Sequence, residues 1–232
     1  MRCVVIGLGQ FGRPTAIELA RSGNEVIAID MVMEDVERIK DKVSLAICAD
    51  ATSMETLKSH GIPEADLLVA AIRDDFEAQA LVVANAVELG IRNIVARASS
   101  ETHERVLKAI GANEVLRPEN EAALHLVQQL TIPGIKEYFE LSDGFSVVEV
   151  KVPEKLAGQA LRDLRLRQDF RVNLIGRRRI VRDEATGKER SVFDVAKPNT
   201  EPLQQGEELV LIGTDLDLAM MMTTLGFEHD ET

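Results

Sequence analysis

The stretch that decides the fold is Cys3–Gly12, whose sequence is CVVIGLGQFG. An apolar strand runs here into a G-x-G-x-x-G turn, and the turn runs into the start of a helix. Gly7 permits the tight turn out of the strand, Gly9 leaves room for a pyrophosphate against the backbone, and Gly12 lets the helix pack close to the strand. The amino end of that helix offers free N–H groups and a partial positive charge to phosphates. The stretch therefore predicts a phosphate site where the first strand ends.

A second apolar run, Val26–Asp30, follows at the spacing that this kind of turn requires. Asp30 comes eighteen residues after Gly12, and its carboxylate can accept hydrogen bonds from a ribose. Strand, glycine turn, helix and acid together predict that the N-terminal part of the chain binds a nucleotide or dinucleotide. A glycine-rich turn without a ligand is the alternative.

Apolar runs and helical patterns then alternate through the first ~135 residues. Strands are expected at Cys3–Ile6, Glu25–Ile29, Ser44–Cys48, Leu67–Ala71, Ile94–Ala96 and Glu114–Leu116. Helices are expected between them at Phe11–Ser22, Glu34–Lys40, Met54–His60, Phe76–Leu89, Glu101–Ile110 and Glu119–Leu130. The predicted fold class is α/β, a Rossmann-like doubly wound parallel sheet with strand order 3-2-1-4-5-6 and right-handed crossovers.

The pattern changes near Ile132-Pro133-Gly134. The expected organisation is an N-terminal domain over residues 1–134, a hinge or linker over 135–143, and a small α+β domain over 144–232. In this last domain we expect strands at Phe145–Val152, Val172–Gly176 and Leu209–Ile212, and helices at Gly158–Leu166 and Leu216–Leu225. A polar loop, Arg182–Arg190, has Thr186-Gly187 as its turn.

Composition narrows the class of protein. The 232 residues carry a formal net charge of −12, and an acidic surface repels nucleic acid, so no nucleic-acid partner is expected. No apolar run approaches the roughly 20 residues that span a bilayer, and the N-terminus leads directly into a strand, so no signal peptide is expected. Cys3 and Cys48 lie in apolar runs, which favours free thiols and a reduced, cytoplasmic protein.

Several short motifs then suggest a family. They are Gly7–Gly12, Asp30, Ala49–Thr52, Ala70-Ala71 and Leu116–Glu119, in this order along the chain. Together with the small C-terminal module they resemble the RCK family (regulator of potassium conductance, also called KTN), and in particular the KtrA- and TrkA-type regulatory subunits of bacterial potassium uptake systems. The resemblance covers nearly the whole chain, and Asp50-Ala51-Thr52 after the third strand is its most specific part.

The resemblance implies a regulatory subunit rather than an enzyme. Proteins of this family form dimers that assemble into an octameric ring under a membrane-embedded potassium-translocating subunit, at the inner face of the plasma membrane. The ring couples nucleotide state to gating, and its ligands include ATP, ADP, NAD and NADH. Some members also bind Mg²⁺ or Ca²⁺ beside the nucleotide, and some bind cyclic di-AMP between their C-terminal domains.

Carried over to this chain, the resemblance gives a set of nucleotide-binding residues: Gly7, Gly9, Gln10, Phe11, Gly12, Asp30, Asp50, Ala51, Thr52, Ala71 and Arg97. Gln10 stands where similar proteins carry an arginine, and glutamine supplies no charge. This departure puts discrimination of ATP from ADP in doubt and leaves NAD(H) open. Arg97 either supplies the missing charge or forms a surface ion pair. Asp50 and Thr52 either contact adenosine or only cap the following helix.

Two further sites follow from the resemblance. Glu119, at a helix start, is a candidate ligand of Mg²⁺ or Ca²⁺, or else it only complements the helix dipole. Arg167, Asn173 and Leu174 resemble the residues that hold cyclic di-AMP. They lie in a basic run from Arg162 to Arg182, for which a solvated face is the alternative.

Two other functions remain open. One is an NAD(P)-dependent oxidoreductase, which the sequence disfavours because Tyr138 is followed four residues later by Ser142 instead of lysine. The other is a nucleotide-sensing subunit of a different transporter, since a fold does not determine its partner.

Overall fold

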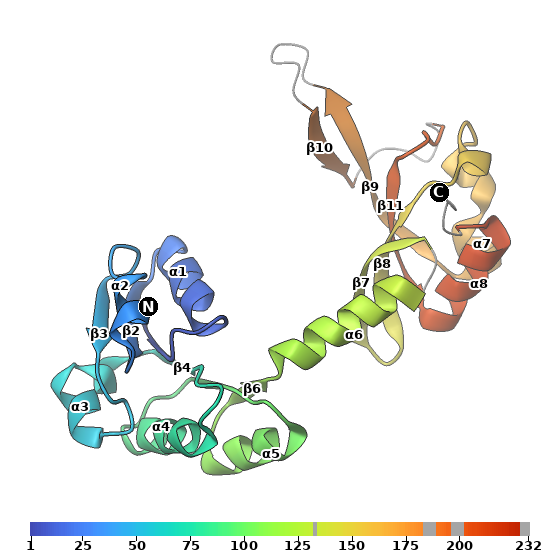
Figure 1. The fold of residues 1–232 in the computed structure, drawn as a ribbon. Coiled ribbons are helices and arrows are strands. Elements are labelled where there is room, and N and C mark those ends of the chain that lie inside the picture. The colour runs from blue at the N-terminus through green and yellow to red at the C-terminus, as the bar shows by residue number, and fades with distance from the viewer. Residues whose placement is uncertain (132–133, 183–188, 196–201, 228–232) are drawn as a thin grey trace. The chain divides into compact units, whose positions relative to one another are not determined.

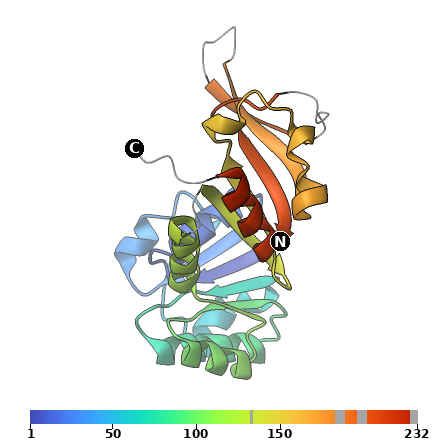
Figure 2. The ribbon, with the colours of Figure 1, turned by 90° about the vertical axis from the view of Figure 1, so that its right-hand side faces the viewer.

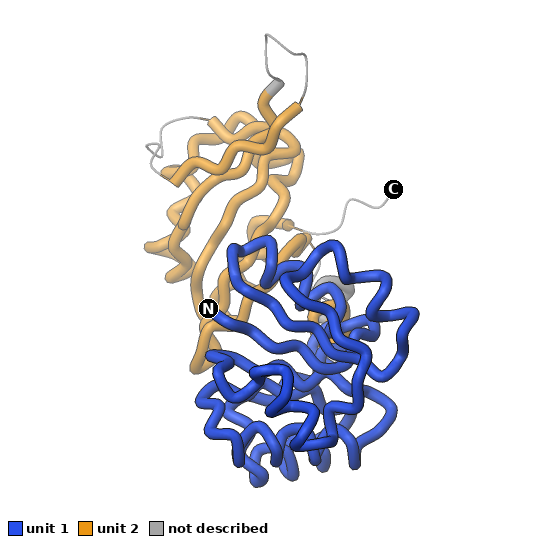
Figure 3. Tube along the Cα trace, turned by 90° about the vertical axis from the view of Figure 1, so that its left-hand side faces the viewer, with its two compact units in different colours: residues 1–122 blue, residues 123–232 orange. Residues whose placement is uncertain are grey.

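The chain folds into two compact units. The computed structural model describes residues 1–131, 134–182, 189–195 and 202–227. One unit spans Met1–Ala122 and the other Ala123–Thr232 (Figure 3). The division falls inside helix α6 (Pro118–Thr131), so the domain boundary expected at residue 134 stays a prediction. In the described part of the chain, no helix is long and apolar enough to cross a bilayer.

The first unit, which is described throughout, contains a six-stranded parallel sheet. Its strands are β1 (Arg2–Ile6), β2 (Glu25–Asp30), β3 (Leu45–Cys48), β4 (Leu67–Ala70), β5 (Ile94–Arg97) and β6 (Glu114–Leu116). Their order is β3-β2-β1-β4-β5-β6, as predicted (Figure 1). Each expected strand agrees with an observed one to within a residue at either end, because buried parallel strands are short continuous apolar runs.

Helices cover both faces of this sheet. One face packs against α1 (Gly12–Arg21) and α2 (Met33–Glu37). The other packs against α3 (Met54–Ser59), the 3-10 turn η1 (Ile62–Glu64), α4 (Phe76–Glu88) and α5 (Glu101–Ile110), and Figure 2 shows α4 and α5 side by side. Side chains of β1 alternate between the two cores, with Val5 in the first and Val4 in the second. The sheet is therefore doubly wound.

The second unit is built on an antiparallel sheet in the order β10-β9-β11-β8-β7. Its strands are β7 (Ile135–Ser142), β8 (Phe145–Lys151), β9 (Asn173–Arg182), β10 (Glu189–Asp194) and β11 (Glu208–Thr214). The 3-10 turns η2 (Glu154–Leu156) and η3 (Leu161–Leu164) and the helices α7 (Leu166–Phe170) and α8 (Asp215–Leu225) complete it. The predicted α+β class is confirmed.

Two expected segments of this unit are corrected. Where a hinge or linker was expected, residues 135–142 form strand β7, which pairs with β8 through a turn in which Asp143 and Gly144 both have positive φ. The helix expected at Gly158–Leu166 is replaced by η3, and α7 begins only at Leu166, after Arg165 turns the chain with a φ of 47°. Of the expected hinge Ile132–Asp143, residues 132–133 lie outside the described residues. The turn Thr186-Gly187 also lies outside them.

Candidate functional site

A cleft of about 740 Å³ opens at the carboxyl edge of the parallel sheet. Strand order reverses between β1 and β4, and ligands of open α/β sheets bind where this happens. Ten of the eleven predicted nucleotide-site residues line it, and so does Glu119: Gly7, Gly9, Gln10, Phe11, Asp30, Asp50, Ala51, Thr52, Ala71, Arg97 and Glu119. Gly12, the third glycine of the turn, does not line the cleft.

The three glycines of the turn have different structural surroundings. Gly7 has a φ of +91°, and a Cβ there would lie 2.9 Å from the backbone carbon of Ala71. A Cβ on Gly12 would lie 1.8 Å from the carbonyl oxygen of Gly7, so the close approach of α1 to the strand requires glycine. A Cβ on Gly9 would meet no atom within 4 Å. Packing therefore does not require glycine at position 9, and the open space there belongs to the cleft.

The amino end of α1 borders the same space. Its N-cap residue, Phe11, makes no side-chain hydrogen bond. In the first turn the amide of Arg13 donates to the carbonyl oxygen of Gly9 at 3.2 Å, and Pro14 has no N–H. The end of α1 therefore offers an anion the amide of Gly12 and the helix dipole.

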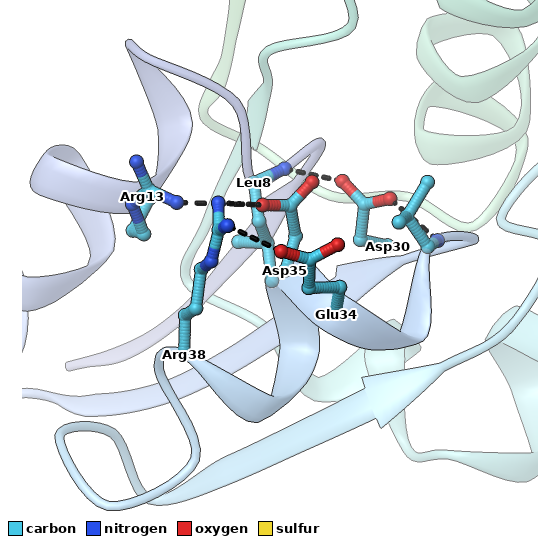
Figure 4. Close-up of polar contacts among 7 residues, drawn as sticks. Leu8, Arg13, Asp30, Glu34, Asp35 and Arg38 are labelled. Carbon is cyan, nitrogen blue, oxygen red and sulfur yellow. Dashed lines mark hydrogen bonds and ion pairs between the residues drawn. The ribbon is translucent and has the colours of Figure 1, made fainter.

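Asp30 joins the glycine turn to the loop after β2. Its carboxylate accepts the amide N–H of Leu8 at 2.6 Å and that of Val32 at 2.8 Å (Figure 4). Each carboxylate oxygen has a second lone pair, so both can still accept a ribose hydroxyl.

Asp35, which the sequence did not single out, also lines the cleft. Its Oδ1 lies 3.3 Å from Nη1 of Arg13 and 3.4 Å from Nη1 of Arg38, and Arg38 also pairs with Glu34 (Figure 4). No motif spacing identifies Asp35 in the sequence. Its position depends on the ion pair between Asp35 on α2 and Arg13 on α1.

Asp50 and Thr52 form a small turn after β3. Oδ1 of Asp50 accepts the Thr52 amide at 2.9 Å and the Thr52 hydroxyl at 2.7 Å. The hydroxyl, and after it the amide, lowers the pKa of the Asp50 carboxyl. Helix α3 is capped instead by Ser53, whose Oγ accepts the amide of Thr56. The interpretation of Asp50 and Thr52 as the helix cap is therefore wrong, while their contact with adenosine stays a prediction.

Arg97 and Glu119 contact each other. Arg97 ends β5 with a side chain only 7% exposed, and its Nη2 pairs with Oε1 of Glu119 in the first turn of α6. The Nε of Arg97 is buried without a hydrogen-bond partner. The ion pair that was the alternative for Arg97 is therefore present, between a buried guanidinium and a mostly exposed carboxylate, while its contact with a phosphate stays a prediction. Glu119 is neutralised by an arginine as well as favoured by the helix dipole.

The cleft as a whole is acidic. Its lining includes six carboxylates, Asp30, Asp35, Asp50, Asp74, Asp75 and Glu119, but only two arginines. Both arginines are paired, Arg97 with Glu119 and Arg73 with Asp74, at 2.9 Å in the second pair. Within the described ranges, no three His, Cys, Asp or Glu side chains are grouped so as to hold a metal ion. The partners that the cleft offers to an anion are therefore backbone amides and arginines that are already paired with carboxylates.

The three residues of the second expected site all belong to the second unit. Arg167 on α7 and Asn173 at the start of β9 are exposed, and Leu174 is partly buried against the core. Much of the surrounding basic run is neutralised by carboxylates: Arg177 by Glu207, Arg178 by Glu149 and Arg179 by Asp194. The side chain of Arg182 lies outside the described residues. No carboxylate partner of Arg167 occurs in the described part of the chain, and its role stays a prediction.

Known proteins are similar to this chain in both sequence and fold. Residues 3–118 match the TrkA-N domain family. The Ktr system potassium uptake protein C of Bacillus subtilis (strain 168) is 32% identical over 215 residues, which cover 93% of each chain. Protein A of the same system and organism is 34% identical over 166 residues, which cover 72% of this chain and 75% of that protein.

Among solved structures, the GsuK RCK domain aligns with a TM-score of 0.51 and 24% identity, over 97% of this chain and 46% of that one. The GsuK channel bound to NAD aligns with a TM-score of 0.52 and 24% identity, over 97% of this chain and 38% of that one. This chain spans less than half of those longer chains, and the likeness concerns the fold. Sequence and fold thus agree with the resemblance found in the motifs, and the chain belongs to the TrkA-N (RCK) family, whose members include potassium uptake proteins of the Ktr system.

Proposed function

We propose that this chain is the nucleotide-gated regulatory subunit of a potassium transporter. The observation that carries the proposal is the cleft of about 740 Å³ between the glycine turn, Asp30 and the Asp50–Thr52 turn. Its volume lies within the range of about 300–1,000 Å³ that is usual for ligand pockets. Relatives that align over most of the chain are potassium uptake proteins, which supports potassium transport as the process.

The ligand is ATP, ADP or NAD(H). Its phosphates lie against Gly9 and the amino end of α1, and its ribose hydroxyls donate to Asp30. Exposed apolar side chains of Met31 and Val32 border the cleft and offer a flat base a surface on which to stack. The acidic lining of the cleft repels the phosphates of a ligand. A divalent cation bound between them would reduce this repulsion and so strengthen the binding of a polyphosphate. Glu119 together with phosphate oxygens would hold Mg²⁺ or Ca²⁺, which would neutralise that charge.

Binding serves sensing rather than chemistry. Among the described residues that line the cleft there is no His, Lys, Tyr or Cys, and the relatives that align over most of the chain are potassium uptake proteins. The bound nucleotide shifts an equilibrium between conformations of a dimer-based octameric ring, which works only if it binds them with unequal affinity. The ring acts in the cytoplasm on a membrane-embedded partner, and Arg167, Asn173 and Leu174 bind cyclic di-AMP.

Isothermal titration calorimetry with ATP, ADP and NADH tests the site. Gly9→Val and Asp30→Ala should each abolish or strongly weaken binding, the first by filling the phosphate space and the second by removing the ribose acceptor. Asp66→Ala is the matched control, because Asp66 also accepts a backbone amide, that of Arg2 at 2.8 Å, but at the amino edge of the sheet. Folded Gly9 and Asp30 variants that bind every nucleotide as the parent does would show that the ligand lies elsewhere.

Potassium flux tests the process. The chain is reconstituted with the membrane subunit that co-purifies with it, and flux is measured with ATP, ADP or NADH. We expect different rates in the different nucleotide states. Equal rates, with binding confirmed, would reduce the chain to a structural subunit, and co-purification with a transporter of another ion would reassign the partner.

A further inference from the structure

Gln79 is a buried polar side chain that no motif singled out. It lies on α4 with 1% of its surface exposed, on the same helix face as the core residues Val82 and Val83. Its Nε2 donates to the carbonyl oxygen of Ala70 at 2.7 Å and to that of Arg97 at 2.9 Å. Both N–H groups of the amide are therefore used.

The amide oxygen is used as well. Oε1 of Gln79 accepts the backbone amide of Ile72 at 3.0 Å. Ile72 and Arg97 both line the cleft. One side chain thus joins two cleft-forming backbone segments at the carboxyl ends of β4 and β5.

These bonds fill a gap in the sheet. The ladder between β4 and β5 ends at the pair Ala70–Ala96. Beyond it the chain after β4 stays bonded to β1, with Ala71 donating to Ile6 at 2.7 Å, while the chain after β5 turns to β6, with Ala98 donating to Leu116 at 2.8 Å. The two strands part where the cleft begins. The amide of Gln79 supplies the hydrogen bonds that a continued ladder would have made.

The guanidinium of Arg97 has few other restraints. Its Nη2 pairs with Glu119, but its Nε is buried without a partner. Beside it lies a cavity of about 10 Å³ lined by Gln79, Phe76 and His103, with the Phe76 and His103 rings stacked 3.9 Å apart. The Arg97 side chain is held at its end by the mostly exposed Glu119 and along its length by the packing that leaves it 7% exposed. The backbone of Arg97 sets where this side chain starts.

We propose that Gln79 is a positioning residue of the nucleotide site. By clamping the carboxyl ends of β4 and β5 it fixes the backbone of Arg97 and points the guanidinium at the phosphates of the ligand. This inference rests on the proposed nucleotide-binding function and deepens it. Gln79 itself does not line the cleft, so it acts on the ligand through the backbone that it holds, and its effect on the phosphates passes through Arg97.

The test compares a ligand that has phosphates with one that lacks them. In calorimetry on the full chain, Gln79→Met keeps the side-chain length but removes all three hydrogen bonds. We expect about tenfold weaker binding of ADP and adenosine affinity within about twofold of the parent. Gln79→Ser provides a second variant should the methionine variant not fold, because its smaller side chain leaves room for water to bridge the three backbone groups.

A double-mutant cycle shows whether the effect passes through Arg97. Arg97→Met alone should weaken ADP as much as Gln79→Met does, and the double variant should be no weaker than either. Additive losses would overturn the proposal, as would an equal loss of ADP and adenosine.

Asn113→Ala is the matched control, since Asn113 accepts the amide of Ile94 at 2.7 Å at the opposite end of β5. It should lower the melting temperature and leave the ratio of ADP to adenosine affinity unchanged. A changed ratio in this control would overturn the proposal, because general loosening of β5 would then explain the effect. A parent protein that binds neither ligand would instead refute the proposed function itself.

Discussion

At the scale of single residues, the glycine turn separates a requirement of the fold from a requirement of the ligand. Gly7 and Gly12 are needed by the protein itself, because a Cβ at either position would collide with backbone atoms. Gly9 has free space around it. A glycine that packing does not require, at the mouth of a cleft, points to the space that a ligand needs.

This difference gives a prediction about stability. Gly12→Ala should destabilise the chain by roughly 1–3 kcal/mol or prevent folding, because the new Cβ would lie far inside contact distance of the Gly7 carbonyl. Gly9→Ala should change stability by less than about 0.5 kcal/mol. Urea unfolding of both variants checks this. A Gly12 variant as stable as the parent would mean that α1 can move away from β1.

Asp50 gives a prediction about pH. The Thr52 hydroxyl lowers the pKa of the Asp50 carboxyl in the folded chain. A folded-state pKa below the unfolded one means that the turn adds stability above the unfolded pKa and loses it as the pH falls through the folded one. Thr52→Val should therefore raise the pKa of Asp50 toward its ordinary value, as followed by carbon NMR of the carboxyl. Thr56→Val, on α3, serves as the control, and an unchanged titration in the Thr52 variant would contradict the assigned hydrogen bond.

At the scale of elements, the second unit depends on a buried ion pair between β9 and the segment before β11. Arg177 and Glu207 are 4% and 1% exposed, and their two hydrogen bonds measure 2.7 and 2.6 Å. A carboxylate this deeply buried is costly once its partner is removed.

Arg177→Met should therefore destabilise the second unit by up to about 3–5 kcal/mol, because among the described residues only Arg179, whose Nε lies 3.9 Å from Oε1, then remains beside the Glu207 carboxylate. Adding Glu207→Gln removes the orphaned charge but keeps an acceptor for the amide of Gln204, which lies 3.1 Å from Oε2. The double variant should recover most of the lost stability in urea unfolding. A double variant as unstable as the single one would show that packing, not the uncompensated charge, causes the loss.

At the scale of the whole molecule, exposed apolar side chains remain on several elements. They include Leu124 and Leu126 on α6 and Leu216 and Met220 on α8, which are between 47% and 80% exposed. Large apolar side chains are costly to leave in water. They are consistent with an assembly of several copies.

We therefore expect light scattering to find a species larger than the monomer, with eight chains as the expected ring. Leu124→Glu together with Leu126→Glu should reduce its size by placing charges on α6. Arg92→Glu, on the loop after α4, is the control. It also makes the surface more acidic, but away from α6, and should leave the size of the assembly unchanged. A monomer at micromolar concentration in the presence of nucleotide would rule out the ring.

The sequence by itself determined the class of the first unit, the order of its strands and the glycine turn with Asp30 at the cleft. Those features follow from local patterns: short apolar runs, a glycine turn, and an acid at a set distance from it. The other predicted cleft residues, such as Asp50, Thr52 and Arg97, came from the resemblance to a family. The small second unit was less predictable. In strand β7, at the edge of its sheet, only the first residue, Ile135, is buried. The strand therefore lacks the alternation of buried and exposed side chains by which a half-buried strand is predicted from sequence.

Only the tertiary structure decided how the candidate residues act on one another. Arg97 and Glu119 were predicted separately, as a cation for phosphate and a ligand for metal, yet they form one ion pair. The role of Gln79 could be inferred only from its hydrogen bonds to three backbone groups at the carboxyl ends of two neighbouring strands. The physical reason is the same in each case. A buried charge or amide needs partners that lie far from it along the chain, and no local pattern specifies those partners until the strands are packed side by side.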